Sequence, residues 1–204
     1  DYTDLLIVKT GMLADKATVD AVSDELQSYG ATRAFQLVVD PVFMATSGDV
    51  LEDQQALEAI KTKLLKKCLI CTPNRDEAAH LLGVSSAHVY GDDDDVEDSR
   101  QIDANADQFL HCFGCLSVLF KGGHDERRPH RVVDTLYIRL DDNDISQELE
   151  ALNKSLVQKG NVDPLLSVEI VDCVPPEEKR GNFVKIRVEH ERIMNAKGHG
   201  SGCT

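Results

Sequence analysis

The sequence predicts an α/β fold with a mainly parallel central sheet and helices on both faces. Through the first 123 residues, short apolar runs alternate with segments of helical periodicity, in the order β-α-β-α-β-α-α-β. The apolar runs are continuous, which is typical of strands buried on both faces. Polar residues and glycines follow these runs directly, at the sheet edge where ligands bind in such folds.

Four apolar runs in this part of the chain are expected to form the parallel strands. Each ends at a Pro, a Gly or a Gly-Gly turn, which separates it from the next segment. They are DLLIVKTG at 4–11, AFQLVVDP at 34–41, CLICTP at 68–73 and CLSVLFKGGH at 115–124.

Four intervening segments place apolar residues at helical spacing. They cover residues 14–30, 51–68, 74–83 and 99–114. The third is the best delimited, because Asn74 is a good N-cap, acidic residues occupy its first turn, and Gly83 ends it.

The second half of the chain is less regular. It predicts strands at 132–140, 165–172 and 182–193 and a helix at 144–160. In the last strand, apolar and charged residues alternate: Val184, Ile186 and Val188 against Lys185, Arg187 and Glu189. This alternation predicts a half-exposed strand.

The composition excludes several classes of partner. The net charge is -14, whereas proteins that bind nucleic acid or anionic membranes need a surplus of Lys and Arg. No apolar run approaches the roughly 20 residues that span a bilayer. The first residues show no secretory signal pattern, so we expect a cytoplasmic protein.

The cysteines allow two interpretations. Cys68 and Cys71, like Cys112 and Cys115, have the spacing of half a zinc site. Residues i and i+3 of a strand point to opposite faces, however, and neither pair lies in a glycine- or proline-rich knuckle. We therefore expect buried core cysteines in a reducing compartment, with a zinc site as the alternative.

The strand-end motifs, in their order, resemble a known family. VKTGML, VVDPVFMATSGD, TPNRDEAAHLLG, FKGGH, VVDTLY and the closing GHGSGCT are similar to the hydroxymethylpyrimidine kinase / phosphomethylpyrimidine kinase family of thiamine biosynthesis. The resemblance covers nearly the whole chain. It implies a ribokinase-like fold and phosphorylation of 4-amino-5-hydroxymethyl-2-methylpyrimidine and its monophosphate, with ATP and Mg2+ as cofactors.

The closing motif carries the catalytic group that the resemblance implies. Cys203 matches the family's general base, which takes a proton from the substrate hydroxyl. Gly200, Ser201 and Gly202 match the anion hole, in which backbone N–H groups approach the developing charge. A flexible glycine-rich tail with an incidental cysteine is the alternative.

The other site residues also follow from the resemblance, position by position. Asn74 and Glu77 match the family's Asn-x-x-Glu, which organises magnesium and the nucleotide phosphates, and Lys121 and Gly122 match its nucleotide end. Met12 matches a residue of the family's pyrimidine pocket, and Asp40 matches its acidic strand end near the metal and phosphates, so the resemblance implies both as substrate-binding residues. The resemblance thus implies Asp40 and Glu77 as metal ligands; for Lys121 alone, an ordinary solvent-exposed lysine is equally consistent with the sequence.

Departures from the family pattern leave alternatives open. We expect a single kinase domain over 1–204, incomplete at both termini, because the family's first glycine-rich loop and its last helix are absent, and we expect an insertion near 140–180. A pyridoxal/pyridoxine kinase of the same fold is one alternative, and a catalytically inactive binding homologue is another. The expected partners are a small-molecule pyrimidine and ATP, and a homodimer stays open.

Overall fold

A central sheet connects the parts of the chain that the computed structural model describes, residues 6–42, 54–89, 96–123, 130–140, 166–171 and 183–192. The described strands form one seven-stranded sheet in the order β1-β2-β3-β4-β5-β7-β6. Their bounds are β1 Leu6–Thr10, β2 Phe35–Val39, β3 Ile70–Cys71, β4 Ser117–Phe120, β5 Arg131–Arg139, β6 Leu166–Val171 and β7 Phe183–Glu191. All seven strands predicted from apolar runs are therefore present.

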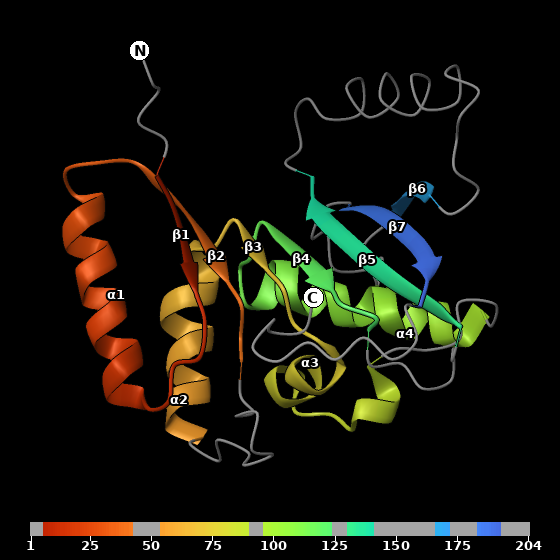
Figure 1. Ribbon diagram of the computed structural model, residues 1–204, viewed down its shortest axis with the longest axis horizontal. Helices are drawn as coiled ribbons and strands as arrows, with labels where there is room; N and C mark the ends of the chain where they lie inside the picture. The colour runs from red at the N-terminus through yellow and green to blue at the C-terminus, as the bar shows by residue number, and fades with distance from the viewer. Residues whose placement is uncertain are drawn as a thin grey trace.

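The sheet has a parallel half and an antiparallel half. Strands β1 to β4 pair in parallel, each with its neighbour in the chain. Strand β5 pairs antiparallel with β4 and β7, and β7 pairs antiparallel with the edge strand β6. The predicted α/β fold is confirmed, with the parallel pairing confined to β1–β4. Their carboxyl ends reach one common edge of the sheet, where α3 lies (Figure 1).

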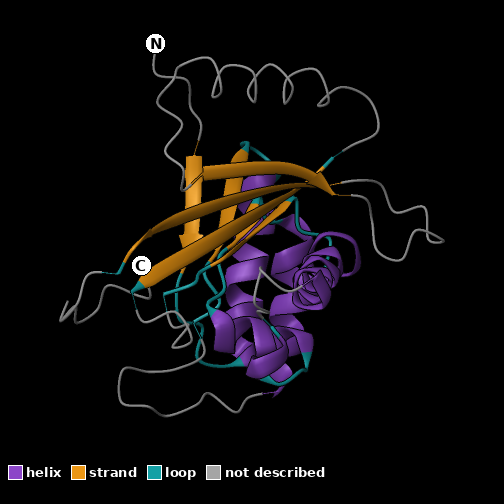
Figure 2. Ribbon diagram, turned by 90° about the vertical axis from the view of Figure 1, so that its right-hand side faces the viewer, coloured by secondary structure: helices purple, strands orange, loops and turns teal. Residues whose placement is uncertain are grey.

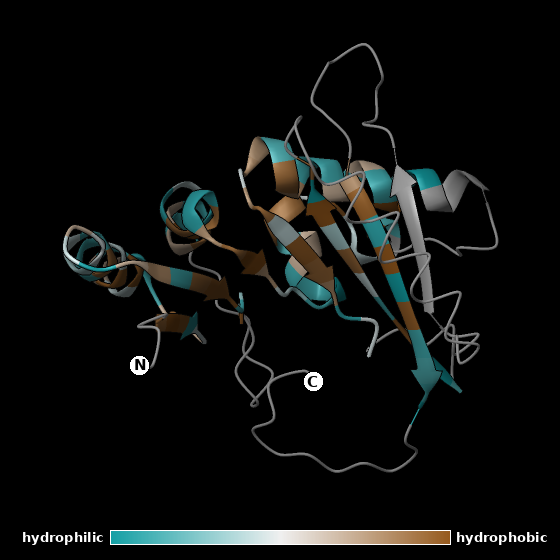
Figure 3. Cartoon of the chain, turned by 90° about the horizontal axis from the view of Figure 1, so that it is seen from above, coloured by the Kyte–Doolittle hydropathy of each residue, from teal (hydrophilic) through white to brown (hydrophobic). Residues whose placement is uncertain are grey.

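The described helices connect the parallel strands. They are α1 Lys16–Gly30, α2 Gln54–Ala59, α3 Arg75–Leu82 and α4 Val96–Asp107, with short 3-10 and π turns η1 Ile60–Leu64, η2 Leu65–Lys67, η3 Ser86–His88 and η4 Gln108–Cys112. Within the predicted helix at 51–68, the described residues form α2, the wider π turn η1 and the tighter 3-10 turn η2. Figures 2 and 3 show the described helices on one face of the sheet, so helices on the second face stay a prediction.

Two helices begin at side-chain caps that fix where they start. Asp15 precedes α1 and accepts a hydrogen bond from the Thr18 backbone N–H at 2.7 Å. Asn74 precedes α3, as predicted, and accepts from the Glu77 N–H at 2.9 Å. Gly83 ends α3 with φ 72°, a left-handed conformation that glycine adopts without steric cost.

Aromatic rings join the antiparallel half of the sheet to the helices. Four successive pairs meet edge to face, with ring centroids 5.2–5.9 Å apart, in the order Phe113, Phe109, Phe120, Tyr137 and Phe183. Such pairs contribute about 0.5–1.5 kcal/mol each beyond burial of their area. The chain of rings runs from η4 across β4 and β5 to β7, which ties the late strand β7 to the parallel half. Hydrophobic colour is concentrated on the strands in Figure 3.

The cysteine prediction is right for three of the four paired residues. Cys68, Cys71 and Cys115 are buried in the core, and burial together with the neighbouring Cys68, Glu77 and Asp40 raises the pKa of Cys71 well above its ordinary value. Cys112 is exposed, so the prediction of a buried residue there is wrong. It is the last residue of the π turn η4, in which Phe109 and Leu110 occupy the core-facing positions.

Burial along β7 does not follow the alternation of apolar and charged residues. Lys185 is 6% exposed, whereas Val188 is 42% exposed. Lys185 turns inward because its ammonium lies 3.0 Å from the Asp103 carboxylate of α4 and 5.7 Å from the Tyr137 ring centroid. Phe183, Val184 and Lys185 are buried together, so the alternating pattern predicted the strand but not which of its residues are buried.

Two further predictions lie outside the described residues, namely the helix at 144–160 and the closing GHGSGCT. The expected insertion near 140–180 is described only at β6, which adds an edge strand to the sheet. None of the helices in the described ranges is both long enough and apolar enough to cross a membrane.

Candidate functional site

Charged and polar side chains meet at the carboxyl edge of the parallel strands. Asp40 follows β2 directly, Thr72 follows β3, and Lys121 follows β4. Glu77 joins them from the first turn of α3. Because β1–β4 run in the same direction, their ends bring these residues, distant in sequence, to one place. We call Lys9, Asp40, Thr72, Glu77 and Lys121 the strand-end cluster.

Asp40 is the acceptor at the centre of the strand-end cluster. One carboxylate oxygen accepts from the Lys9 ammonium at 2.7 Å, and the other accepts from Lys121 Nζ at 3.0 Å and Thr72 Oγ1 at 3.2 Å. Burial raises the pKa of the Asp40 carboxyl, but the hydrogen bonds and charges of the two lysines together outweigh burial and hold that pKa below its ordinary value. Asp40 is therefore an anion at neutral pH.

Lys121 connects the two carboxylates of the cluster. Its backbone forms an isolated parallel bridge with Asn74, and its N–H donates to the Pro73 carbonyl at 3.0 Å. Its ammonium lies 3.0 Å from Asp40 and 3.7 Å from Glu77, and its side chain is 13% exposed. The alternative of an ordinary solvent-exposed lysine is therefore excluded by the structure.

Glu77 has one role in the helix cap and faces the cluster as well. Its Oε2 accepts from the Asn74 backbone N–H at 2.7 Å, which completes a reciprocal capping box with the Asn74 side chain. Glu77 is buried, and burial raises the pKa of its carboxyl above the ordinary value, although Lys121 and the Asn74 N–H act in the opposite direction. The site thus contains two carboxylates whose pKa values are shifted in opposite directions.

The turn after β4, residues 121–123, lies against β5. The Gly122 N–H donates to the Asp134 carboxylate at 2.7 Å. A Cβ atom at Gly122 would lie 2.0 Å from the Val133 carbonyl oxygen, so only glycine fits at this close approach. Gly122 is thus fixed between two strands rather than placed in an open loop.

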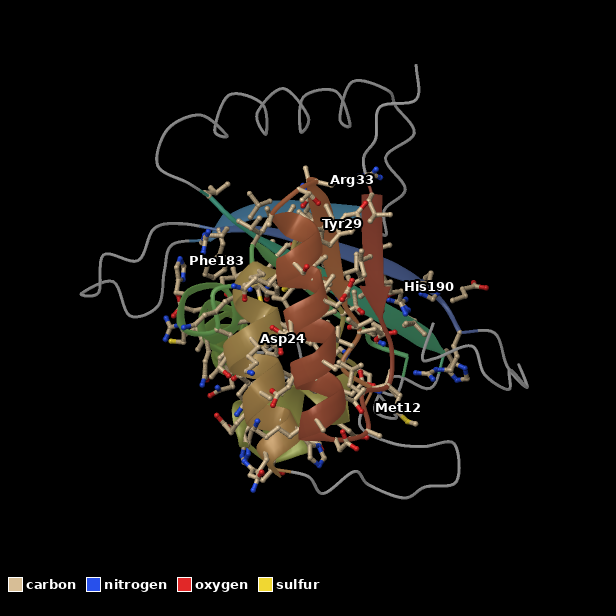
Figure 4. All side chains as sticks on the ribbon, turned by 90° about the vertical axis from the view of Figure 1, so that its left-hand side faces the viewer. Met12, Asp24, Tyr29, Arg33, Phe183 and His190 are labelled. Carbon is tan, nitrogen blue, oxygen red and sulfur yellow. The ribbon has the colours of Figure 1, made fainter. Side chains whose placement is uncertain are left out.

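The structure brings together most of the described residues that the resemblance predicted. Three of these residues lie together, namely Asp40, Glu77 and Lys121. Asn74 joins them through its backbone and its cap. Met12 follows β1, is 51% exposed and points outward in Figure 4. Gly200, Ser201, Gly202 and Cys203 lie outside the described residues.

Sequence reasoning missed three residues of this region, Lys9, Thr72 and Asp134. Lys9 precedes the end of β1, and Thr72 stands in the TP pair after β3. Their positions at strand ends were a usable signal, because the ends of neighbouring parallel strands converge. Asp134 lies inside β5, and its contact with Gly122 depends on the antiparallel pairing of β4 with β5, which no local pattern indicates.

The donor set limits which metal the cluster could hold. Asp40 and Glu77 offer carboxylate oxygens, and within the described ranges no group of three or more His, Cys, Asp or Glu side chains is placed to hold a metal ion. Two carboxylates fit Mg2+, which binds one or two protein carboxylates and completes its shell with waters and substrate phosphates.

Solved structures show that the fold is ribokinase-like. The chain is similar to pyridoxal kinase from Staphylococcus aureus in complex with AMP-PCP, with a TM-score of 0.54 and 22% identity over 97% of this chain and 50% of that one. Pyridoxal kinase from Bacillus subtilis, in an ADP complex, gives a TM-score of 0.52 and 19% identity over 96% and 50% of the two chains. At this identity the likeness shows the fold alone.

Relatives found by sequence are more similar to this chain than these two solved structures are. The hydroxymethylpyrimidine/phosphomethylpyrimidine kinase of Rhizobium meliloti is 38% identical over 121 residues, which is 59% of this chain and 40% of the relative. The enzyme of the same description from Escherichia coli is 37% identical over 123 residues, 59% and 41% of the two chains. The matched part of this chain thus spans about two fifths of the length of these relatives.

The family model described as phosphomethylpyrimidine kinase matches residues 3–155. The match includes β1–β5 and the whole strand-end cluster, and it ends before β6 and β7. On this match over most of its length, the chain belongs to the phosphomethylpyrimidine kinase family.

Proposed function

We propose that this chain forms the part of an ATP-dependent kinase that transfers a phosphoryl group to 4-amino-5-hydroxymethyl-2-methylpyrimidine and to its monophosphate, in thiamine biosynthesis. The observation that carries the proposal is the strand-end cluster, in which Lys121 lies between Asp40 and Glu77 in a chain of this family. Relatives of the same description support the choice of substrate.

The charges of the cluster suit phosphoryl transfer. The transition state spreads negative charge over the phosphoryl oxygens, so catalysis consists mainly of positioning and charge neutralisation. Lys121 is a buried cation whose backbone is held by the Asn74 bridge and the Pro73 carbonyl, so it is preorganised to meet a phosphate. Lys9 is 60% exposed at its side chain and supplies a second cation from β1.

Asp40 and Glu77 would hold Mg2+ in this proposal. Magnesium, when bound, neutralises charge on the nucleotide phosphates. Asp40 is held as an anion by its lysines, and Glu77 has one oxygen committed to the helix cap, so each residue contributes a carboxylate of fixed orientation. Those fixed carboxylates restrict where the metal and the phosphates can sit.

Cys203 is the proposed general base, and Gly200, Ser201 and Gly202 the proposed anion hole. These assignments rest on the family resemblance of the closing motif. A thiolate beside backbone N–H donors is chemically suited to accept the proton of the hydroxymethyl group, because such donors lower the pKa of a thiol.

The same proposal places the kinase in the cytoplasm, where cysteines stay reduced, and none of the described cysteines forms a disulfide. A homodimer remains a prediction, which light scattering of the purified protein tests directly. A mass of one chain at micromolar concentration would exclude it.

A side-by-side assay tests the function. The full chain is incubated with Mg2+ and ATP and either hydroxymethylpyrimidine or pyridoxal, and product formation is followed by mass spectrometry. We expect a higher kcat/KM with hydroxymethylpyrimidine. Equal or reversed preference would favour the pyridoxal kinase alternative, and no turnover with either substrate in the folded protein would favour the inactive homologue.

The Cys203→Ala variant tests the base. We expect kcat to fall by the ~10²–10⁴-fold that is typical of a lost acid–base group. Cys112→Ala is the matched control, because Cys112 is the exposed cysteine of η4 and is remote from the motif in sequence. Turnover of Cys203→Ala equal to that of the control would remove Cys203 from this role.

A further inference from the structure

The turn at residues 121–123, here called the Lys121 turn, is held by side chains from two later parts of the chain. The Gly122 N–H donates to Asp134 Oδ1 of β5 at 2.7 Å. The Gly123 carbonyl oxygen accepts from Arg192 Nη1 at 2.6 Å, and Arg192 directly follows β7. A carboxylate and a guanidinium thus bind the donor and the acceptor of neighbouring residues of the same turn.

These two bonds replace the regular pairing of the sheet at this point. The ladder between β4 and β5 ends at the pair Phe120 and Thr135. Beyond it, Gly122 is buried against Val133, and the Asp134 side chain takes its N–H. Hydrogen bonds with one ionised partner are roughly twice as strong as neutral ones, so the path of the turn is firmly set.

The position of the turn determines where Lys121 lies. On its other side, Lys121 is held by the bridge to Asn74 and by the Pro73 carbonyl. Its ammonium must reach Asp40 at 3.0 Å and Glu77 at 3.7 Å at once. A shift of the turn by 1 Å would change both distances, and misplacement on that scale can cost roughly 10²-fold in rate.

We propose that Asp134 and Arg192 are positioning residues that fix the Lys121 turn from β5 and β7 and thereby set Lys121 against the two carboxylates. This inference rests on the proposed kinase function. It also extends the site beyond the family match at residues 3–155, because Arg192 lies outside that match. The late strand β7 then contributes to the site through the residue that follows it as well as through packing.

The test compares truncating and conservative variants of both residues. Asp134→Ala and Arg192→Met remove the two bonds, whereas Asp134→Asn and Arg192→Lys keep an acceptor and a donor. Arg131→Gln is the matched control: its ion pair with Glu189 also joins β5 to β7 but does not touch the turn. The full chain is used, and circular dichroism checks that each variant is folded.

We expect kcat to fall roughly 10- to 100-fold in Asp134→Ala and Arg192→Met. We expect KM for hydroxymethylpyrimidine to stay within about twofold, since these variants alter the turn and not the substrate contact. We expect the affinity for AMP-PCP with Mg2+ to weaken. The conservative variants should recover most of the lost kcat. A kcat and an AMP-PCP affinity equal to those of Arg131→Gln in the folded truncating variants would overturn the proposal. If Asp134→Ala fails to fold, Arg192→Met decides, because its bond lies at the exposed end of β7.

A separate readout distinguishes failure of this inference from failure of the proposed function. Amide exchange of Gly122, followed by NMR, should accelerate at least tenfold in Asp134→Ala and stay unchanged in Arg131→Gln. If the unaltered protein shows no pyrimidine kinase activity, the proposed function fails, and the exchange rate still decides on the positioning role. Unchanged exchange of Gly122 in Asp134→Ala would overturn it.

Discussion

Two lysine–carboxylate groups of similar burial lie in different parts of this molecule. In the strand-end cluster, the Lys121 side chain is 13% exposed and pairs with Asp40 at 3.0 Å. Under the antiparallel half of the sheet, the Lys185 side chain is 7% exposed and pairs with Asp103 at 3.0 Å. Burial and distance alone therefore do not distinguish a candidate active site from a structural ion pair.

The surroundings of the two groups do distinguish them. Asp103 and Lys185 lie between α4, β5 and β7, where the Tyr137 hydroxyl donates to Asp103 at 2.7 Å and the Tyr137 ring centroid lies 5.7 Å from the Lys185 ammonium. The strand-end cluster combines two lysines with two carboxylates at the ends of β1, β2 and β4 and the start of α3, and Lys9 opens it to solvent. A buried ion pair closed off from solvent suits a structural role, whereas an open group of several charges can exchange partners with a ligand.

The largest expected effect tests the ion pair of Asp103 and Lys185, here called the enclosed pair. Lys185→Met leaves the Asp103 carboxylate buried without its cation, and breaking a buried pair in this way costs about 3–5 kcal/mol. We expect urea unfolding of Lys185→Met to show a loss of this size.

The control for Lys185→Met is Lys63→Met, which breaks an ion pair with Asp20 on the surface. We expect a far smaller loss there, because exposed ion pairs contribute little. The double variant Asp103→Asn/Lys185→Met should recover much of the stability, since neither charge then remains buried. Equal losses in Lys185→Met and Lys63→Met would contradict the structural role.

The next largest expected effect tests the strand-end cluster, here also called the open cluster because Lys9 is exposed to solvent. Lys121→Met removes a preorganised cation, and we expect kcat to fall ~10²–10³-fold, as for other removed electrostatic donors. Its loss of stability should be smaller than that of Lys185→Met, because Asp40 keeps Lys9 and Thr72 as partners. Steady-state kinetics and urea unfolding of the same preparation measure the two quantities. A variant with full activity and a large loss of stability would make the cluster a second structural pair.

The sequence predicted the open cluster better than the enclosed pair, for a physical reason. Asp40, Asn74 and Lys121 follow apolar runs, and in a parallel sheet that local signal is enough to place them at one edge. Asn74 was also identifiable as a cap, because a helix N-terminus has a local signature.

Residues that depend on pairing between distant segments were not predictable in this way. The burial of Lys185 depends on Asp103 of α4, and the alternation in β7 is the same whichever face is buried. Asp134 depends on the pairing of β5 with β4, and Cys112 depends on where a π turn ends. Each of these is decided by tertiary contacts rather than by the neighbouring residues.

A smaller effect compares the two capped helices. Asn74→Ala should cost about 1 kcal/mol, typical of a lost N-cap, and should also lower kcat, because the backbone N–H of Glu77 loses the Asn74 side chain that accepts its hydrogen bond. Asp15→Ala removes the exposed cap of α1 and should lower stability alone. Thermal unfolding and kinetics of both variants give the comparison. A loss of kcat in both, or in neither, would separate the capping box from the function of the cluster.

The smallest effect is a pH dependence that separates Glu77 from Asp40. Burial raises the pKa of the Glu77 carboxyl above its ordinary value of 4.5, so the folded protein binds this proton more tightly than the unfolded chain. The stability that Glu77 contributes is therefore lost as pH rises from 4.5 through its folded pKa. Asp40 behaves in the opposite way, because its pKa lies below the ordinary 3.8 and its stabilisation is lost only as pH falls below that value.

Glu77→Gln and Asp40→Asn test the two signs, because each amide keeps an acceptor and cannot ionise. From pH 4.5 to 7, the unfolding free energy of the unaltered protein should fall relative to Glu77→Gln, while its difference from Asp40→Asn stays constant. Below pH 3.8 the second difference should shrink. Urea unfolding at intervals of half a pH unit resolves both trends. If the Glu77→Gln difference instead grew in favour of the unaltered protein with rising pH, Lys121 and the helix cap would outweigh burial at Glu77, and the strand-end cluster would stabilise both carboxylates as anions.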